Sequence, residues 1–130
     1  MQITYRNYAI HSDDMLRGGP NGLRDGAAYK ERINTYYPKN KERGDVRSIA
    51  FTFEYRVHES DKAYEVGYYR VISKREGKEN ISYGQFHVVL NKINDEWKIV
   101  QDWDADKIAG VKVGEEHFMK FSENGIYELK

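Results

Sequence analysis

From residue 46 onward, hydrophobic and polar residues alternate along most of the chain, which is the pattern of half-buried β-strands. In the segment VRSIAFTFEYRVHE (46–59), the residues that would share one face of a strand are Ile49, Phe51, Phe53, Tyr55 and Val57. Comparable segments follow at 63–74, 81–93 and 97–104, and short charged turns separate them. Short turns between consecutive strands predict that these four strands form an antiparallel sheet.

The segment before these strands has a different pattern. DGAAYKERINTYYP (25–38) predicts a helix, because apolar residues recur at helical spacing, Asp25 can cap its start and Pro38 must end it. The glycine-rich residues 17–26 predict a loop, and residues 1–16 predict a short strand or a loose arm.

The tail predicts a short helix over 115–121 and a final edge strand within NGIYELK (124–130). One helix followed by four long antiparallel strands predicts an α+β fold, in which a curved sheet of four or more strands wraps over the helix. We expect residues 1–130 to form one domain, with a core of about 12–106 and a C-terminal extension over 107–130. A single short helix cannot cover a whole sheet face, so we expect a second copy of the chain to cover the remainder in a homodimer.

Composition narrows the classes of function. The 21 basic residues balance 21 acidic ones, which gives no electrostatic reason to expect binding to nucleic acid. The absence of cysteine excludes thiolate catalysis and cysteine zinc sites. No apolar run is long enough to span a membrane and the start does not resemble a signal peptide, so we expect a cytoplasmic protein. The eleven tyrosines and five phenylalanines are typical of a pocket lined by aromatic side chains, and they suit a partly hydrated sheet equally well.

Three carboxylates stand at alternate positions near the end of the last long strand, in NDEWKIVQDWDAD (94–106). They are Asp102, Asp104 and Asp106. The segment is not a calcium loop of the EF-hand type, because a lysine occupies the glycine position and a valine the position of the final glutamate. Carboxylates beside an indole are partly desolvated, which suits acid–base catalysis. The alternative is the solvated end of a strand.

The strand at 81–93 has two unlike faces. Phe86, Val88 and Leu90 form an apolar face that should meet the core, whereas His87 lies on the amphiphilic face. His87 could carry a proton or anchor a ligand, or it could be a hydrogen-bonded residue of an interface. The candidate catalytic residues are therefore Asp102, Asp104 and His87. The candidate ligand-binding residues are Tyr83, Gln85, Tyr69, Glu65, Tyr55 and Trp103. No histidine or carboxylate spacing predicts a metal site, and no cofactor is expected.

Three segments resemble the nuclear transport factor 2-like superfamily. They are GLRDGAAYKERI (22–33), AYEVGYYRV (63–71), with a glycine at the bend of its strand, and YGQFHVVLNKINDEWKIVQDWD (83–104), with a tryptophan just after a hairpin. They occur in the order of the family, and the whole match covers roughly residues 12–106. The superfamily includes ketosteroid isomerases and SnoaL-type polyketide cyclases, and the resemblance implies their cone-shaped, cystatin-like fold. The chain departs from it by lacking the usual N-terminal helices that form a lid and by its longer tail.

The resemblance and the uncovered sheet face leave three functions open. The first is a small-molecule-binding domain with an aromatic pocket for a small hydrophobic or carbonyl-bearing ligand. The second is an enzyme of the isomerase, dehydratase or cyclase kind, in which Asp102 or Asp104 moves a proton and a tyrosine or His87 polarises a carbonyl. The third is a structural dimerisation module. The superfamily hosts catalysts and binding proteins alike, so fold alone does not choose among them.

Overall fold

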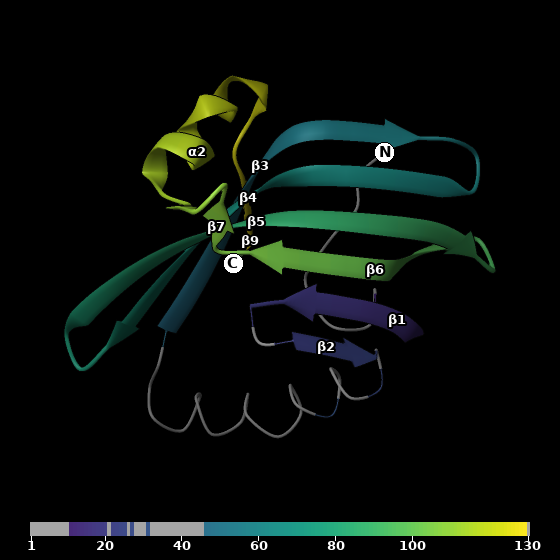
Figure 1. Ribbon diagram of the computed structural model, residues 1–130, viewed down its shortest axis with the longest axis horizontal. Helices are drawn as coiled ribbons and strands as arrows, with labels where there is room; N and C mark the ends of the chain where they lie inside the picture. The colour runs from purple at the N-terminus through teal and green to yellow at the C-terminus, as the bar shows by residue number, and fades with distance from the viewer. Residues whose placement is uncertain (1–10, 21, 26, 28–30, 32–45, 130) are drawn as a thin grey trace.

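The computed structural model describes residues 11–20, 22–25, 27, 31 and 46–129, and Figure 1 shows the arrangement of their elements. A seven-stranded sheet has the strand order β2-β1-β6-β5-β4-β3-β9, and a second ladder joins β7 and β8. The strands of the sheet are β1 (His11–Gly19), β2 (Gly22–Asp25), β3 (Val46–His58), β4 (Lys62–Arg75), β5 (Lys78–Ile93), β6 (Glu96–Ala105) and β9 (Tyr127–Leu129). The other elements are β7 (Lys107–Ile108), β8 (Val111–Lys112), helix α2 (Glu115–Lys120) and the 3-10 turn η2 (Ser122–Asn124).

The four long strands predicted from the alternating pattern are confirmed as β3 to β6. Each of them pairs antiparallel with the next. The β4–β5 hairpin turns at Glu76 and Gly77, and the β5–β6 hairpin turns at Asn94 and Asp95, with positive φ at all four residues. Two consecutive residues of this kind match the right-handed twist of the flanking strands. These tight turns therefore fix the register of β4, β5 and β6, and with it the face to which each side chain points.

The N-terminal part differs from the prediction. Residues 17–26 were expected to form a loop, but β1 and β2 pair there as an antiparallel hairpin. Asp25, the expected helix cap, is the last residue of β2. Ala27 and Glu31 are helical, and the rest of the predicted helix lies outside the described residues. In addition, β1 runs parallel to β6, so the sheet is not antiparallel throughout.

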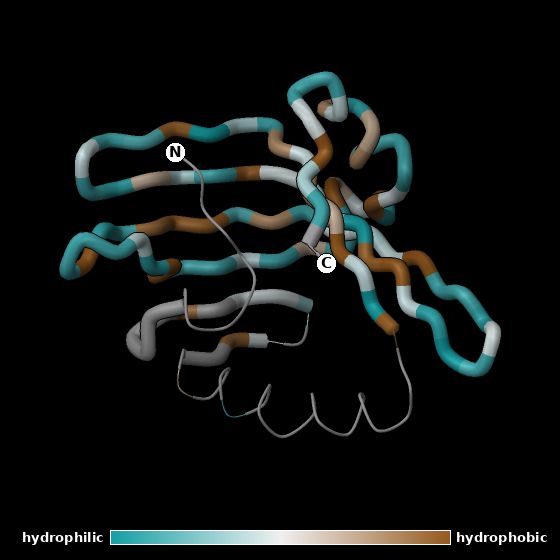
Figure 2. Tube along the Cα trace, turned by 180° about the vertical axis from the view of Figure 1, so that it is seen from behind, coloured by the Kyte–Doolittle hydropathy of each residue, from teal (hydrophilic) through white to brown (hydrophobic). Residues whose placement is uncertain are grey.

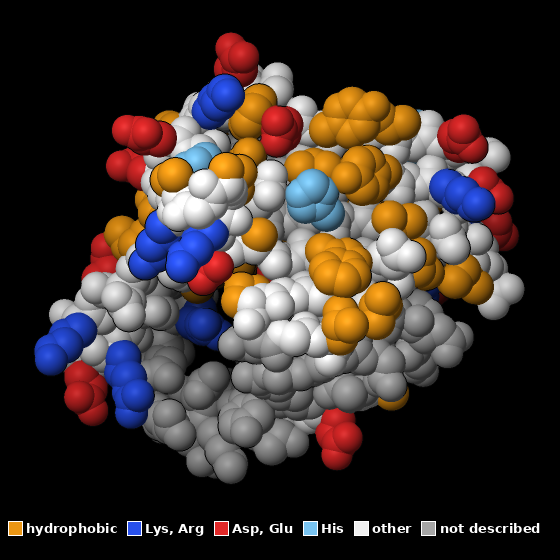
Figure 3. Space-filling view, in the orientation of Figure 1, with side chains coloured by type: hydrophobic (Ala, Val, Ile, Leu, Met, Phe, Trp, Pro, Cys, Tyr) orange, Lys and Arg blue, Asp and Glu red, His pale blue; other side chains and the backbone are white. Residues whose placement is uncertain are grey.

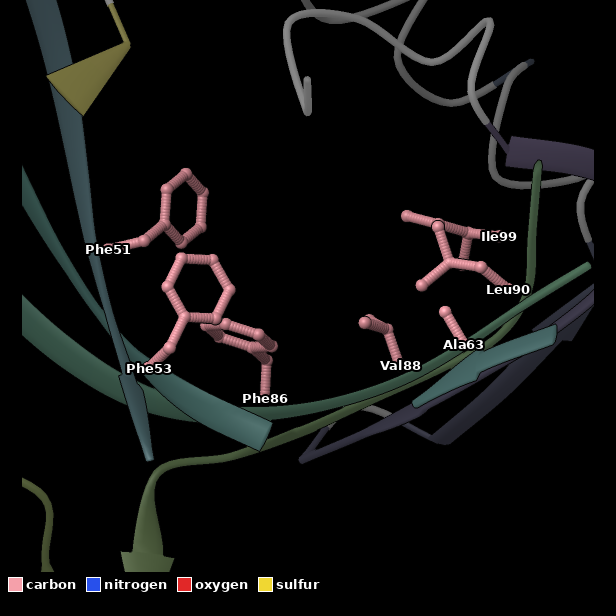
Figure 4. Packing of buried hydrophobic residues seen from close by; sticks show 7 residues of the cluster. All are labelled: Phe51, Phe53, Ala63, Phe86, Val88, Leu90 and Ile99. Atoms are coloured by element: carbon pink, nitrogen blue, oxygen red, sulfur yellow. The ribbon is translucent and has the colours of Figure 1, made fainter. Parts of the chain in front are cut away.

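The sheet is strongly curved, and a hydrophobic cluster lies on its concave side, which we call the inner face (Figure 4). The buried residues of this cluster are Phe51, Phe53, Ala63, Phe86, Val88, Leu90 and Ile99. Phe86 lies edge-to-face against both Phe51 and Phe53, with ring centroids 5.7 Å apart in each pair. The predicted apolar face of β5 is thus confirmed. Figure 2 shows the hydrophobic positions interspersed with hydrophilic ones along the strands.

The convex side of the sheet, which we call the outer face, is covered at one end by the C-terminal segment (Figure 1). The buried residues there are Ala50, Tyr68, Val113 and Phe118. The Thr52 hydroxyl donates a hydrogen bond of 2.8 Å to the backbone carbonyl of Phe118, which ties α2 to β3. Beyond η2 the chain reaches the edge of the sheet, where β9 pairs antiparallel with β3. The short helix and edge strand expected in the tail are therefore confirmed.

The described elements form a curved sheet of many strands with one short helix, α2. The sequence predicted a curved sheet that wraps over a helix at 25–38. The described residues show the curvature of the sheet, and most of that predicted helix lies outside them. No helix in the described part of the chain is long and apolar enough to cross a membrane.

Candidate functional site

A β-bulge in β3 determines which side chains of that strand reach the inner face. Phe53 pairs with Gly67 and Tyr55 pairs with Val66, so Glu54 is an extra residue in β3. Because one extra residue reverses the alternation, Tyr55 points to the outer face and Arg56 to the inner face. The sequence predicted the opposite for both residues, since strict alternation puts Tyr55 beside Phe53.

A glycine makes this distortion possible. A Cβ atom at Gly67 would lie 2.2 Å from the carbonyl oxygen of Thr52 and 2.8 Å from the ring of Phe86. No other residue type fits without movement of the β3 backbone, so Gly67 allows the close approach of the two strands where the bulge begins. The sequence-based interpretation of Gly67 as the site of a bend agrees with this geometry.

A second bulge, in β6, turns two carboxylates inward. Leu90 pairs with Ile99 and Val89 pairs with Gln101, so Val100 is the extra residue. Without it, strict alternation from the buried Ile99 would bring Gln101 and Trp103 to the inner face. With it, Asp102 pairs with Val88 and Asp104 pairs with Phe86, the positions that face inward. These two residues are the candidate carboxylates of the sequence analysis, and both lie on the concave side.

The register places three charged residues and one valine in a single row across four strands of the inner face. Arg56 of β3 pairs with Glu65 of β4, Glu65 pairs with Val88 of β5, and Val88 pairs with Asp102 of β6. Strands lie about 4.8 Å apart, so the backbones of Glu65 and Asp102 are separated by about 10 Å. The neighbouring row is mainly apolar, and consists of Phe53, Gly67, Phe86 and Asp104. We define the inner site as Arg56, Glu65, Asp102 and Asp104 together with Phe53, Tyr69 and Phe86.

Two of the carboxylates of the inner site are buried, which is unusual for charged side chains. The side chain of Glu65 is 0% exposed, and Asp102 is 7% exposed. Glu65 is compensated by an ion pair with the Nε of Arg56, whose side chain is 27% exposed. A buried carboxylate is tolerated only when it is paired or hydrogen-bonded, so this contact explains how Glu65 can lie among apolar residues. Asp102 and Asp104 also have interaction partners in the fold.

The other predicted site residues lie on the outer face. Val66 pairs with His87, and His87 pairs with Trp103, so these three side chains share the convex side. A hydrogen bond of 3.0 Å joins the Tyr64 hydroxyl and the Nδ1 of His87. The structure therefore does not bring His87 together with Asp102, because the two side chains point to opposite sides of the sheet.

The remaining predicted residues divide in the same way. Glu65 and Tyr69 belong to the inner face, as their pairing with Val88 and Gly84 shows. The predicted residues of the outer face are Tyr55, Tyr83, Gln85, His87 and Trp103. A single aromatic pocket lined by all of them is thus excluded, because a sheet separates the two groups.

The end of the outer face that α2 does not cover is apolar, and no charged side chain of the described residues lies at its centre. Its exposed large side chains are Leu16, Tyr55, Val57, Tyr64 and Trp103. Trp103 is 42% exposed, and its ring lies over Gly18, where a Cβ atom would come within 2.2 Å of the ring. Figure 3 shows hydrophobic side chains gathered over strands β3 to β6. We call these five residues and His87 the outer patch.

A separate polar cluster lies where α2 covers the outer face. The Tyr68 hydroxyl donates a hydrogen bond of 3.1 Å to Glu54, and the Tyr68 ring stacks on Phe121 at 5.8 Å. Burial raises the pKa of Tyr68 above its ordinary value, and the nearby charge of Glu54 raises it further. His117 accepts a hydrogen bond of 3.1 Å from the backbone N–H of Gly114 and so caps the start of α2.

Within the described ranges, no group of three or more histidine, cysteine or acidic residues is placed to hold a metal ion. The charged residue of the inner site that the sequence did not predict is Arg56. A hydrophobic–polar pattern assigns it to the face opposite Phe53, and nothing in the local sequence marks Glu54 as an extra residue. Only the pairing of β3 with β4 reveals its position.

Comparison with known proteins supports the fold. The sequence matches no protein-family model and no curated protein. An NTF2-like protein with a cystatin-like fold from Novosphingobium aromaticivorans superposes with a TM-score of 0.60 at 14% identity, over 80% of this chain and 70% of that one. A ketosteroid isomerase-like protein from Erwinia carotovora gives 0.56 at 17% identity, over 75% and 76%. A protein from Catenulispora acidiphila, solved in complex with S-DNPA, gives 0.58 at 16% identity, over 75% and 74%.

At these identities the likeness concerns the fold, and it agrees with the resemblance seen in the sequence. The chain therefore has the nuclear transport factor 2-like fold.

Proposed function

We propose that the inner face binds a small, largely apolar molecule, and that Glu65, Asp102 and Arg56 position the polar groups of that ligand. The observation that carries this proposal is the burial of two carboxylates on a concave, aromatic surface. A mostly apolar surface with a few convergent polar groups is the usual composition of a small-molecule site. The protein of similar fold from Catenulispora acidiphila, solved with S-DNPA, supports a binding function for this fold.

The test uses two glycines that each lie beneath an aromatic ring, one on each face. A Cβ atom at Gly84 would come within 2.3 Å of the Tyr69 ring on the inner face, and one at Gly18 within 2.2 Å of the Trp103 ring on the outer face. Gly84→Ala and Gly18→Ala should therefore displace matched rings on opposite sides of the sheet.

The probe is 1-anilinonaphthalene-8-sulfonate (ANS), and the readout is its fluorescence in a titration of the folded protein. We expect saturable binding to the wild type, a several-fold loss of affinity in Gly84→Ala and unchanged affinity in Gly18→Ala. Circular dichroism checks that both variants are folded. Absence of saturable binding, or an equal loss in both variants, would contradict a ligand site on the inner face.

A second candidate function is acid–base catalysis at the same site, with Asp102 or Asp104 as the proton carrier. Its support is the position of both carboxylates on the concave side, with Asp104 paired to Phe86, together with the similar fold of the ketosteroid isomerase-like protein. His87 has no part in this candidate, because it points to the outer face. NMR would detect exchange of deuterium from solvent into cyclohexanone, next to its carbonyl. Catalysis predicts exchange that is lost in Asp102→Asn or Asp104→Asn, and no exchange above background argues against it.

We further propose that the outer patch is covered by a second copy of the chain. Aromatic residues are enriched and charged residues depleted at the centre of protein interfaces, and the outer patch has this composition. The formal net charge of zero leaves little overall repulsion between two copies. If self-association is found without any ligand binding, the function reduces to that of a structural dimerisation module.

A further inference from the structure

Arg56 is held in a defined position on the inner face by three contacts. Its Nε forms the ion pair with the buried Glu65. Its guanidinium carbon lies 4.0 Å from the centroid of the Phe53 ring and 5.6 Å from that of the Tyr127 ring. The guanidinium is thus fixed by one carboxylate and two aromatic rings.

These contacts use only part of the hydrogen-bonding capacity of the side chain. A guanidinium has five N–H donors, and the single Nε donor is the one directed at Glu65. In the part of the chain that the structure describes, Glu65 is the only hydrogen-bond partner of the Arg56 side chain. The two terminal Nη groups form a planar fork whose N–H bonds run parallel, which matches the two oxygens of a carboxylate.

The C-terminal strand helps to hold this fork. Tyr127 of β9 pairs with Phe51, and its ring lies 5.3 Å from the Phe53 ring, at the edge of the inner face. The tail that carries Tyr127 is anchored on the other side of the sheet by the fully buried Phe118. The C-terminal segment therefore passes from the outer face to the edge of the inner site and contributes one of the rings beside Arg56. A side chain that is already ordered loses little conformational entropy when a ligand binds.

We propose that Arg56 is the anion-binding residue of the inner site, and that the ligand carries a carboxylate on an apolar or aromatic body. This inference rests on the ligand-binding function proposed above. The body of the ligand would lie against Phe53 and Phe86, and its carboxylate would accept hydrogen bonds from the Nη groups. The simpler alternative is that Arg56 only neutralises Glu65. That role requires a positive charge, but it does not require a free fork or a second aromatic ring.

The experiment compares benzoate with its neutral analogue benzamide by calorimetric titration of the full chain. We expect the wild type to bind benzoate at least about tenfold more tightly than benzamide, as a charge-assisted pair of hydrogen bonds implies. In Arg56→Lys, which keeps a charge near Glu65 but has no fork, most of this preference should disappear. The Nε–H resonance of Arg56 in 15N NMR spectra should shift with benzoate and not with benzamide.

Tyr127 offers a matched pair of variants that leaves the ion pair in place. Tyr127→Phe keeps the ring and should bind benzoate like the wild type, whereas Tyr127→Ala should bind it about threefold more weakly. If Arg56→Lys does not fold, the two Tyr127 variants still test whether the orientation of the Arg56 guanidinium determines the affinity for benzoate.

The outcomes separate this inference from the proposed function. Equal affinity for benzoate and benzamide, or a preference retained in Arg56→Lys, would overturn the role of Arg56 and leave the ligand site standing. Binding of ANS to the inner face without any binding of benzoate would overturn it as well. If neither ANS nor the two small probes bind, the ligand-binding function fails and this inference fails with it.

Discussion

The inner and outer faces of the sheet are built from the same strands, yet they have opposite properties. Tyr64 and Glu65 are neighbours in β4, but the tyrosine is partly exposed on the convex side, whereas the glutamate is 0% exposed on the concave side. The inner face buries charged groups among aromatic rings, and the outer patch exposes aromatic rings without formal charge. Buried charge suits the orientation of a ligand, and exposed aromatic surface suits a protein partner.

Two one-residue bulges establish this division. The extra residues, Glu54 in β3 and Val100 in β6, reverse the alternation of side chains beyond them. As a result, Arg56 and Asp102 reach the concave side, while Tyr55 and Trp103 reach the convex side. Without the bulges, Arg56 and Asp102 would lie on the convex side, and Tyr55 and Trp103 would lie on the concave side.

The largest expected effect concerns the ion pair of the inner face. Arg56→Gln should lower the free energy of unfolding by about 3–5 kcal/mol, because it leaves the carboxylate of Glu65 buried without its cation. The double variant Arg56→Gln with Glu65→Gln should recover much of this loss, since no buried charge remains. Urea denaturation of the two single variants and the double variant measures the coupling. Additive losses of unfolding free energy would show that Arg56 and Glu65 contribute to stability independently of each other.

The next prediction compares the stability lost when an apolar side chain is truncated on each of the two faces. Leu90→Ala removes a fully buried side chain of the inner face and should cost about 2–5 kcal/mol of unfolding free energy. Val57→Ala, in the outer patch, should change it by about 0.5 kcal/mol or less at low protein concentration. Thermal and urea denaturation give both values. Similar costs for the two variants would mean that the faces do not differ in burial.

A third effect belongs to the outer patch. Trp103→Glu should raise the dissociation constant for self-association at least about 30-fold, because it puts a charge at the centre of an aromatic interface. Analytical ultracentrifugation over a range of concentrations measures this change. The control is Ile81→Glu, which changes a side chain of similar exposure near the β4–β5 turn, outside the outer patch. A wild type that is monomeric throughout the range would refute the homodimer.

The smallest effect arises in the cluster under α2. Because the pKa of Tyr68 is raised in the folded protein, its contribution to stability is complete below pH 10 and is lost as the pH rises through the folded-state value. Tyr68→Phe should cost about 1 kcal/mol at pH 8, through loss of the hydrogen bond to Glu54. This difference should shrink in urea denaturation above pH 10. A constant difference from pH 8 to pH 11 would argue against the raised pKa.

The sequence predicted the long strands, their antiparallel order and the two faces of β5, because side-chain alternation and short turns are local signals. It also predicted the short helix and edge strand of the tail. It misassigned residues 17–26 as a loop, because local composition does not show that Gly18 lies under the Trp103 ring.

The candidate site was less predictable than the fold. The carboxylates Asp102 and Asp104 were identified from their spacing, but the bulge that turns them inward depends on pairing between strands. The same reason explains why Arg56 was missed and why Tyr55 and His87 were grouped with residues of the other face. A shift of one residue in register is invisible in the alternation itself.

The most direct test of the division between the faces is methyl NMR on one labelled sample under two perturbations. Methyl groups of Val88, Leu90 and Ile99 report on the inner face, and those of Val57 and Val89 report on the outer face. We predict that ANS shifts the first group and leaves the second unchanged, and that dilution of the protein shifts the second and leaves the first unchanged. Shifts on the outer face with ANS, or on the inner face with dilution, would contradict the account.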